Sequence, residues 1–259
     1  MTLHDPTAFL GWLSPHSIEW YQQLSALQHM YTYTWNSTIS NPNGEVIFDE
    51  EVEEMIKNKK VLDVGCGHGD FTLHCSSFAK EIVGFDVTEN FLDIANAHKK
   101  ANLSYIVGNT KQGLPFKNGE FDSAFIRKGP TSAYPSLARI VKKGGTIIGL
   151  HPGDNSGIEL PQIFPNLFEQ SSGTPILDKI NDQLENSKFT SYKVEHIACT
   201  EYLHSSIDVL KLRCFGQTPQ VYERLKKENL SEVTKNFNDN RTKQGLAITF
   251  SRYIIRIIV

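Results

Sequence analysis

The chain has 259 residues, of which 39% are hydrophobic and 21% are charged, and its formal net charge is −3. These values are typical of a soluble globular protein and suit one large domain or a domain with a small cap. The four cysteines form no C-x-x-C pair and the nine histidines form no H-E-x-x-H motif. The sequence therefore disfavours a disulfide scaffold and a bound metal.

The N-terminal part of the chain is acidic, with eight acidic residues and no lysine or arginine before Lys57. Such a segment repels a nucleic-acid backbone, and we interpret its acidic residues as solvated helix faces. Apolar spacing predicts a helix over 15–30. Turn-forming residues indicate an irregular linker over 31–44, and a second helix is expected over 48–58, where Asp49 suits the N-cap. No apolar stretch is long enough to span a bilayer, so we expect a cytoplasmic protein that does not bind membranes.

From Lys60 onward, short apolar strands alternate with helices. Strands are expected over 61–65, 81–87, 103–109, 121–127, 146–153, 191–202 and 246–259, and helices over 70–79, 89–101, 134–144 and 176–187. This alternation predicts an α/β, Rossmann-like fold with a seven-stranded, mostly parallel sheet and helices on both faces. We divide the chain into an N-terminal helical cap over 1–45 and a main domain over 46–259, with a helical insertion at about 201–245 before the last strand.

Three glycines follow the first strand of this sheet. In "VLDVGCGHGD", residues 61–70, Gly65 and Gly67 would tighten the turn and let a ligand lie against bare backbone. Ligands bind at the carboxyl ends of parallel strands, and the helix that starts near Asp70 would present free amides there. Asp63 precedes Gly65 by two residues, where it would meet a positive group of the ligand.

An acid ends the second strand. Asp86 lies 21 residues after Gly65, so its carboxylate would accept both ribose hydroxyls of a nucleoside that crosses the turn. The alternative is that Asp86 caps the helix near Thr88. A dinucleotide site needs a small residue at position 70, whereas Asp70 would repel a pyrophosphate. The residues favour a ligand with an adenosine, a sulfonium and an amino-acid end over NAD.

Several segments resemble one enzyme family. "VLDVGCGHG" together with "IVGFDVTENFLDIA" is similar to the class I S-adenosylmethionine-dependent methyltransferases. "GNTKQGLPFKNGEFDSAFI" and "LARIVKKGGTIIGL" resemble later parts of the same family, so the likeness covers residues 46–153. It implies S-adenosylmethionine as cofactor and an enzyme that transfers its methyl group.

The resemblance implies which residues hold the methionine end of this donor. Asp63 and the backbone of Gly65 and Gly67 would bind the amino and carboxylate groups. Cys66 would contribute only its backbone. Arg127, which ends the fourth expected strand, falls where the family's chain passes the methionine moiety.

The resemblance also implies the residues around the nucleoside. Asp86 would hold the ribose, and Val87 would pack on the adenine. Asn109 stands where the family commonly has an acid, and its side-chain carbonyl would accept a hydrogen bond from the adenine amino group as a neutral acceptor. Thr110 would donate its backbone amide to the ring.

Methyl transfer needs little protein chemistry, since the cofactor carries the activated group. His151, in "GLHPG" after the fifth strand, is the candidate catalytic base, and a loop histidine bonded to backbone is the alternative. Tyr31, Tyr33 and Trp35 would either fold over the cofactor, with Tyr33 as a contact, or form the core of the cap.

The methyl acceptor carries no signature in the sequence. "FIRKGPTSAYPSLARIVKKGGTIIGLHPG" resembles, in its spacing, the ribosomal large-subunit guanine-N1 methyltransferases, but those enzymes carry a cysteine-rich zinc module and this chain has no cysteine before Cys66. We therefore expect a small-molecule acceptor, with RNA as the second candidate and DNA not expected. A non-catalytic protein that binds S-adenosylmethionine stays open as an alternative, as does the oligomeric state.

Overall fold

The computed structural model describes residues 2–98, 100–170 and 172–259. Its strands are β1 (Ser37–Ile39), β2 (Lys60–Val64), β3 (Glu81–Asp86), β4 (Leu103–Val107), β5 (Phe121–Arg127), β6 (Val141–Pro152), β7 (Ser191–Leu203) and β8 (Leu246–Ile258). Its α-helices are α1 (Ile18–Gln28), α2 (Gly44–Met55), α3 (Asp70–Cys75), α4 (Glu89–Ala95), α5 (Tyr134–Ile140), α6 (Leu160–Ile163), α7 (Pro175–Glu185), α8 (Ser206–Arg213) and α9 (Pro219–Asn240). Short 3-10 helices are η1 (Pro6–Ala8), η2 (Thr110–Gln112) and η3 (Thr131–Ala133).

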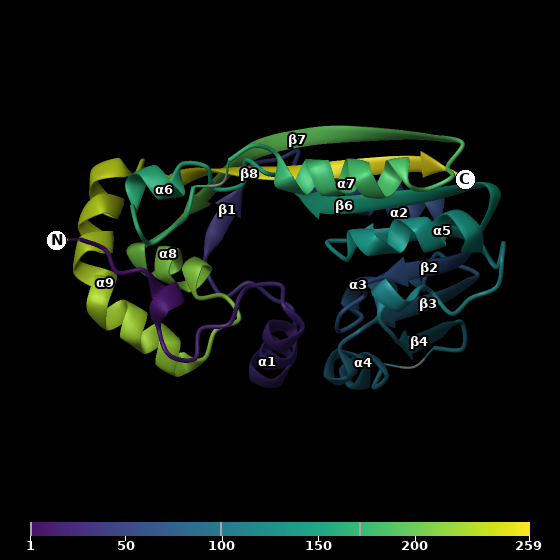
Figure 1. Cartoon of the computed structure of the whole chain (residues 1–259), viewed down its shortest axis with the longest axis horizontal. Coiled ribbons are helices and arrows are strands. Elements are labelled where there is room, and N and C mark those ends of the chain that lie inside the picture. The colour runs from purple at the N-terminus through teal and green to yellow at the C-terminus, as the bar shows by residue number, and fades with distance from the viewer. Residues whose placement is uncertain (1, 99, 171) are drawn as a thin grey trace. The chain divides into compact units, whose positions relative to one another are not determined.

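The described residues form two compact units, both drawn in Figure 1. Unit 1 comprises the described parts of Met1–Asn41, Asn155–Gly173 and Ala198–Phe250. Unit 2 comprises the described parts of Pro42–Asp154, Thr174–Ile197 and Ser251–Val259. The division of the chain into a cap over 1–45 and a main domain over 46–259 stays a prediction.

Unit 2 is built around a parallel sheet. β2 lies at its centre, with β3 and then β4 on one side and β5 and then β6 on the other. Strand order reverses between β2 and β5, and open α/β sheets bind ligands outside the carboxyl ends of the strands at such a point. The Rossmann-like, mostly parallel sheet is confirmed, and β8 runs antiparallel to β6.

The predicted number of strands is wrong. The sheet of the described residues has eight strands, in the order β1-β7-β8-β6-β5-β2-β3-β4, instead of seven. The additional strand is β1, which pairs antiparallel with β7 through Ser37 and Leu203. It lies inside the expected linker because three residues are too few to show a strand periodicity in the sequence.

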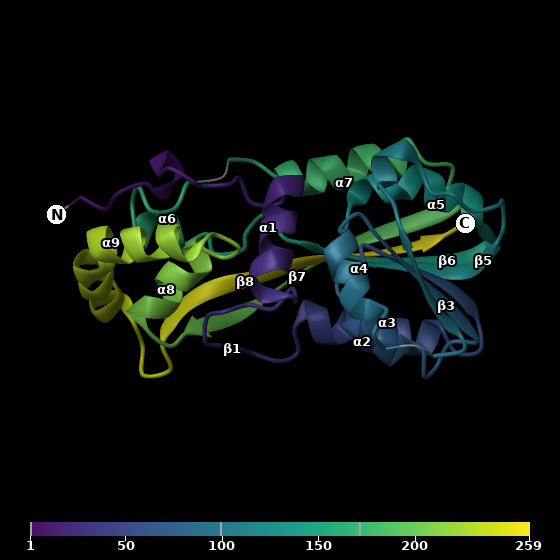
Figure 2. The same cartoon turned by 90° about the horizontal axis from the view of Figure 1, so that it is seen from below.

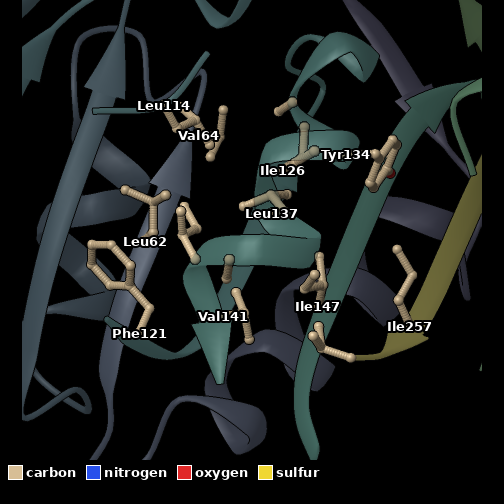
Figure 3. Close-up of a cluster of buried hydrophobic side chains, with 14 of the residues drawn as sticks. Leu62, Val64, Leu114, Phe121, Ile126, Tyr134, Leu137, Val141, Ile147 and Ile257 are labelled. Carbon is tan, nitrogen blue, oxygen red and sulfur yellow. The ribbon is translucent and has the colours of Figure 1, made fainter. Parts of the chain in front are cut away.

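Successive residues of the central strands face opposite layers. Leu62 and Ile126 belong to a core that contains Leu137 of α5 and residues of α7 (Figure 3). Their neighbours Val61 and Phe125 belong to a second core with residues of α2 and α3. Because both faces are covered, the strands read as continuous apolar runs, and each fully buried side chain contributes about 1.5–3 kcal/mol.

Unit 1 is largely helical and holds α1, α6, α8 and α9, of which α8 lies beside α9 (Figure 2). In the same unit, the ring of Phe215 packs at centroid distances of 5.4–5.6 Å against Trp20, Tyr31, Tyr33 and Trp35. The aromatic residues of the expected linker are therefore members of a packed cluster. Among the described helices, none is long and apolar enough to cross a membrane.

Several element boundaries differ from the sequence-based expectation, and two of them have a clear local cause. The helix expected to end at Gly144 ends at Ile140, because Val141 has extended backbone dihedrals and begins β6. The second helix begins at Gly44 instead of residue 48. Asn43 caps it by accepting hydrogen bonds from two amides of its first turn, so Asp49 is not the cap.

Candidate functional site

The candidate site lies at the carboxyl end of β2, where the turn after β2 meets the turn after β5. A Cβ atom at Gly65 would lie 2.8 Å from the Cα of Gly129 and 2.9 Å from the Cδ of Pro130. Gly65 also has a φ of +79°, in the left-handed region that favours glycine. This glycine is required by the contact between the two turns, whether or not it also touches a ligand.

Gly67 differs from the other glycines of the turn because it borders open space. Its φ is +55°, and no described atom lies within 4 Å of the position that a Cβ would take. At Gly69, by contrast, a Cβ would lie 2.6 Å from the hydroxyl of Tyr105 and 2.7 Å from the Cβ of Ala95. Gly67 is therefore the position of this turn where a ligand has room to lie against the backbone.

The amides of the turn are already bound to β3. Gly65 and Cys66 donate their amides to the carbonyl oxygen of Phe85 at 2.7 and 3.3 Å, and Gly67 donates to Asp86 Oδ2 at 2.9 Å. These bonds fix the turn and occupy the amides that would otherwise bind an anion. The backbone groups that remain for a ligand are therefore mainly hydrogen-bond acceptors. Burial raises the pKa of the Cys66 thiol, which is consistent with a backbone role for this residue.

Asp63 is a buried carboxylate with one unpaired oxygen. Its residue is 1% exposed, Oδ2 accepts a hydrogen bond from Thr72 Oγ1 at 2.6 Å, and Oδ1 has no partner among the described residues. Burial raises the pKa of Asp63 to about 7 against the opposing effect of Thr72. Because a buried carboxylate without a partner is costly, a positive group is the ligand that suits this oxygen.

Asp86 lies beside the open face of the turn. Oδ2 accepts the amide of Gly67, and Oδ1 accepts the amide of Thr88 at 2.8 Å, so Asp86 also orders the start of the helical segment that follows. Each carboxylate oxygen has more than one lone pair and retains capacity for a hydroxyl donor. The next residue, Val87, keeps 39% of its surface exposed and so can contact a ligand.

The residues after β4 are held by local bonds. Asn109 Oδ1 accepts the amide of Lys111 at 3.0 Å and so caps η2. Thr110 is buried, and its hydroxyl lies 2.7 Å from that of Ser132 in η3. The segments after β4 and β5 are therefore joined to each other at the same edge of the sheet as the glycine turn. The adenine contacts predicted for Asn109 and Thr110 stay predictions.

Arg127 is paired with the acidic helix α2. Its guanidinium donates to both carboxylate oxygens of Asp49 at 2.8 Å, lies 3.6 Å from Glu45, and stacks over the ring of Phe71 at 4.9 Å. The interpretation of the acidic N-terminal residues as solvated helix faces is thus wrong for Glu45 and Asp49. Their partners come from distant strands, which the sequence alone does not reveal.

His151 and Tyr33 each contact another aromatic residue of their own unit. His151 is 2% exposed, and its Nε2 lies 2.8 Å from the hydroxyl of Tyr134. Burial, with nearby Lys179, lowers the pKa of His151 to about 3, so its ring is neutral at physiological pH. Tyr33 belongs to unit 1, where it stacks on Trp35 at 4.4 Å. Both proposed roles stay predictions.

Three residues of the site escaped the sequence analysis. Thr72 is the partner of Asp63, and Gly129 with Pro130 forms the second wall of the turn. The "GP" pair after β5 does signal a turn. The pair does not reveal that this turn packs on the glycine turn, because that contact depends on the order of strands in the sheet.

Known proteins match the segment that carries this site. Residues 61–145 match a family model described as a methyltransferase domain. The demethylmenaquinone methyltransferase of Lactococcus lactis subsp. lactis is 32% identical over 122 residues, which are 42% of this chain and 46% of that protein. The demethylmenaquinone methyltransferase of Bacillus licheniformis is 30% identical over 142 residues, which are 50% of this chain and 61% of that protein. The chain spans about half the length of the curated relatives it matches.

Solved structures share the fold over most of the chain. A functionally unknown protein from Deinococcus radiodurans R1 aligns with a TM-score of 0.62 at 16% identity, over 93% of this chain and 97% of that one. A putative methyltransferase from Bacillus halodurans C-125 aligns with a TM-score of 0.53 at 17% identity, over 83% of this chain and 98% of that one. At sequence identities this low, the likeness to these structures shows only a shared fold. Residues 61–145, which carry the glycine turn and Asp86, are therefore similar to a methyltransferase domain.

Proposed function

We propose that the protein transfers the methyl group of S-adenosylmethionine to a small-molecule acceptor. The observation that carries this proposal is the turn after β2. Gly67 borders open space there and donates its amide to Asp86, and the strand before the turn carries Asp63 with its buried, unpaired oxygen. These groups fit a ligand that has a positive amino-acid end and a ribose. When bound, the cofactor supplies a methyl group that is already activated by its sulfonium.

We expect different residues of the site to bind different parts of this donor. Asp63 and the carbonyl oxygens of the turn from Gly65 to Gly67 would hold the amino group, since the amides of the turn are already bonded to β3. Asp86 would accept the ribose hydroxyls, and Val87 would cover one face of the adenine. Arg127, locked by Asp49, would close the methionine end. Each of these roles positions the donor, and none requires a proton transfer.

A small-molecule acceptor is favoured by the relatives, which are named for the methylation of demethylmenaquinone. We take from them only the class of acceptor. RNA stays the second candidate and a non-catalytic binding protein the third. Incubation with S-adenosylmethionine that carries a labelled methyl group, followed by separation of a cell extract into a metabolite fraction and an RNA fraction, distinguishes the three. Label in the metabolite fraction supports the proposal, whereas label only in RNA, or in neither fraction, contradicts it.

The catalytic role predicted for His151 and the cofactor contact predicted for Tyr33 are the least supported parts of the proposal. A neutral, buried histidine whose pKa is about 3 is a poor proton acceptor, so its bond to Tyr134 favours a structural role. Unchanged turnover in the variant His151→Ala would remove it from the mechanism. For Tyr33, an unchanged affinity for the donor in Tyr33→Ala would remove it from the cofactor contacts. The cytoplasmic location also stays a proposal.

The donor site is tested by a matched pair of glycine variants. Gly67 and Gly144 both have positive φ, at +55° and +75°, and both border open space, but Gly144 lies in the first half of β6, near the amino end of β5. Alanine at either position costs about 1–2 kcal/mol in backbone strain. Only at Gly67 would the new methyl group occupy the space of the donor.

Calorimetric titration with S-adenosylhomocysteine measures the difference. We expect Gly67→Ala to weaken binding at least tenfold and Gly144→Ala to bind as tightly as the unchanged chain. Equal affinities in the two variants would place the donor elsewhere. Titration with NAD is the negative control, and tighter binding of NAD than of S-adenosylhomocysteine would indicate a dehydrogenase instead.

A further inference from the structure

Arg127 and Asp63 point to the same layer of unit 2. Asp63 in β2 pairs with Phe125 in β5, and register partners of neighbouring strands point their side chains to one face of the sheet. Arg127 lies two residues beyond Phe125 and therefore points to that face too. The ring of Phe71 in α3 lies 4.9 Å from the Arg127 guanidinium, and the next residue, Thr72, bonds Asp63. One helix thus contacts both charged side chains.

The opposite charges of Arg127 and Asp63 act on each other. Burial raises the pKa of Asp63, and the charge of Arg127 opposes this rise. Burial also opposes the charge of Arg127, but its bonds to Asp49 and the nearby carboxylates, Asp63 among them, raise its pKa. Asp63 Oδ1 nevertheless has no hydrogen-bond partner among the described residues. The ligand edge therefore presents a negative and a positive group, which suits a ligand that carries both charges.

Arg127 has one arm that the fold does not engage. Its Nε and Nη2 each donate to one carboxylate oxygen of Asp49 at 2.8 Å, and Nη2 lies 3.6 Å from Glu45. Within the described part of the chain, no residue accepts a hydrogen bond from the third nitrogen, Nη1. Because a guanidinium is planar, a carboxylate that grips one edge fixes the direction of the remaining arm.

Asp49 and Phe71 hold this guanidinium from two sides. The side chains of Asp49 and Arg127 are 30% and 24% exposed, so the ion pair is partly withdrawn from water. The ring of Phe71 is itself fixed, since it packs edge-on against Phe125 at a centroid distance of 5.6 Å. A stacked ring and a two-pronged carboxylate leave a guanidinium little freedom. The direction of Nη1 is therefore set by residues of α2 and α3.

The glycine turn is poorly suited to bind the carboxylate of the donor. The amides of Gly65, Cys66 and Gly67 already donate to β3. The helix α3 follows and begins at Asp70, whose carboxylate disfavours a second anion at the first turn of this helix. A carboxylate at this edge therefore needs a side-chain cation.

We propose that Asp49 is a positioning residue for the methyl donor: with Phe71, it directs Nη1 of Arg127 to bind the donor's carboxylate. The proposal rests on the methyltransferase function proposed above. It divides the amino-acid end of the donor between two opposite charges, with the ammonium at Asp63 and the carboxylate at Arg127. Asp49 acts through Arg127 and does not itself touch the donor, so recognition of the carboxylate depends on α2.

The test compares two ligands that differ only in this carboxylate. S-adenosylhomocysteine carries it, and the decarboxylated analogue keeps the amino group but has hydrogen in place of the carboxylate. Calorimetry with the whole protein gives the ratio of their affinities. General damage to the site weakens both ligands and leaves the ratio unchanged, whereas loss of a carboxylate contact weakens S-adenosylhomocysteine alone.

Two variants change the ion pair, and a third is the matched control. Asp49→Asn keeps the shape of the positioning side chain without its charge, and Arg127→Met removes the guanidinium. The double variant with both changes leaves no unpaired charge and serves if Arg127→Met does not fold. The control is Arg256→Met, because Arg256 donates to Glu51 of the same helix α2 in the same two-pronged way.

We expect the unchanged chain to bind S-adenosylhomocysteine about tenfold or more tightly than the analogue, as a charge-assisted hydrogen bond predicts. Arg127→Met should abolish this preference, Asp49→Asn should reduce it by about threefold or more, and Arg256→Met should keep it. Equal affinities in the unchanged chain, or a preference that survives in Arg127→Met, would overturn the inference. A preference that is unchanged in Asp49→Asn would refute the positioning role.

The same titrations separate this inference from the proposed function. Binding of both ligands with equal affinity rejects the role of Asp49 and Arg127 and leaves the donor site standing. No binding of either ligand overturns both. Circular dichroism of each variant checks that its fold is retained, and the affinity for the decarboxylated analogue shows whether the rest of the site is intact.

Discussion

Two carboxylates at the ligand edge of unit 2 have opposite surroundings. Glu45 faces Lys128, Arg127 and Arg252, and these cations hold the pKa of its carboxyl at about 2 despite burial. Asp63 is buried more deeply and receives one hydrogen bond, so burial raises its pKa to about 7. The charge of Glu45 is thus compensated by the protein, whereas that of Asp63 is not.

The different surroundings of Glu45 and Asp63 indicate a structural role for one carboxylate and a binding role for the other. A carboxylate that the fold surrounds with cations stabilises the native state, because the charged form is favoured there. A carboxylate that the fold buries with an unpaired oxygen destabilises the native state, and such an arrangement is typical of a site that awaits a partner. Glu45 therefore belongs to the framework of the ligand edge, and Asp63 belongs to its binding function.

The largest expected effect is that of Glu45→Gln on stability. The substitution keeps the size of the side chain but leaves Lys128 and Arg252 without their shared carboxylate. Breaking a buried ion pair from one side typically costs 3–5 kcal/mol, and we expect a loss of about 3 kcal/mol here because Glu45 is not fully buried. Urea denaturation at pH 7 measures the free energy of unfolding. A loss below about 1 kcal/mol would show that the cluster is solvated.

The second largest expected effect is a gain in stability. Asp63→Asn mimics the protonated carboxyl and should raise the free energy of unfolding by about 2 kcal/mol at pH 8, since the folded protein no longer has to bury a charge. The same variant should bind S-adenosylhomocysteine more weakly, because the oxygen that would meet the amino group is replaced or neutralised. Denaturation and calorimetry on one preparation measure both. A less stable variant with unchanged affinity would contradict the comparison.

Much of the ligand edge was predictable from local patterns. β5 has the bounds expected from the sequence, 121–127, and the glycine turn and Asp86 lie at the ends of β2 and β3 as predicted. These features depend on short apolar runs and on residue types that adopt special backbone conformations, and both can be read from a few neighbouring positions.

The contacts that distinguish Glu45 from Asp63 were not predictable. Glu45 and Arg252 are separated by 207 positions, and the acidic helix was expected to face solvent. The same limit applies to His151, whose burial against Tyr134 and low pKa arise from packing between β6 and α5. Charge compensation is a property of the assembled sheet, so periodicity in the sequence carries no information about it.

A smaller effect is expected in the pH dependence of the free energy of unfolding, to which the two carboxylates contribute with opposite sign. For Glu45 the folded pKa of about 2 lies below the ordinary value of 4.5, so its stabilisation is present above pH 4.5 and is lost as the pH falls toward 2. For Asp63 the folded pKa of about 7 lies above the ordinary value of 3.8, so stability from this group falls as the pH rises from 3.8 through 7.

Difference profiles isolate these contributions from those of other carboxylates. The stability gained by Asp63→Asn should be larger at pH 8 than at pH 5, by about 2 kcal/mol or less. The stability lost by Glu45→Gln should shrink below pH 4. Parallel profiles for the unchanged chain and Asp63→Asn between pH 5 and 8 would mean that Asp63 does not titrate in this range.

The smallest expected effect is that of Glu51→Gln, which repeats the Glu45 change six residues further along α2. Glu51 accepts two hydrogen bonds from Arg256 at 2.6 Å, but the side chains are 33% and 30% exposed, and Arg256 keeps a second partner in Glu195. Exposed ion pairs contribute about 0–1 kcal/mol, so we expect a loss of about 0.5 kcal/mol that shrinks further in 0.5–1 M salt. Denaturation under the conditions used for Glu45→Gln makes the two variants a matched pair. Both carboxylates are paired with arginine, so burial is the difference between them on which this prediction depends. An equal loss in the free energy of unfolding in Glu51→Gln and Glu45→Gln would show that burial does not determine the effect.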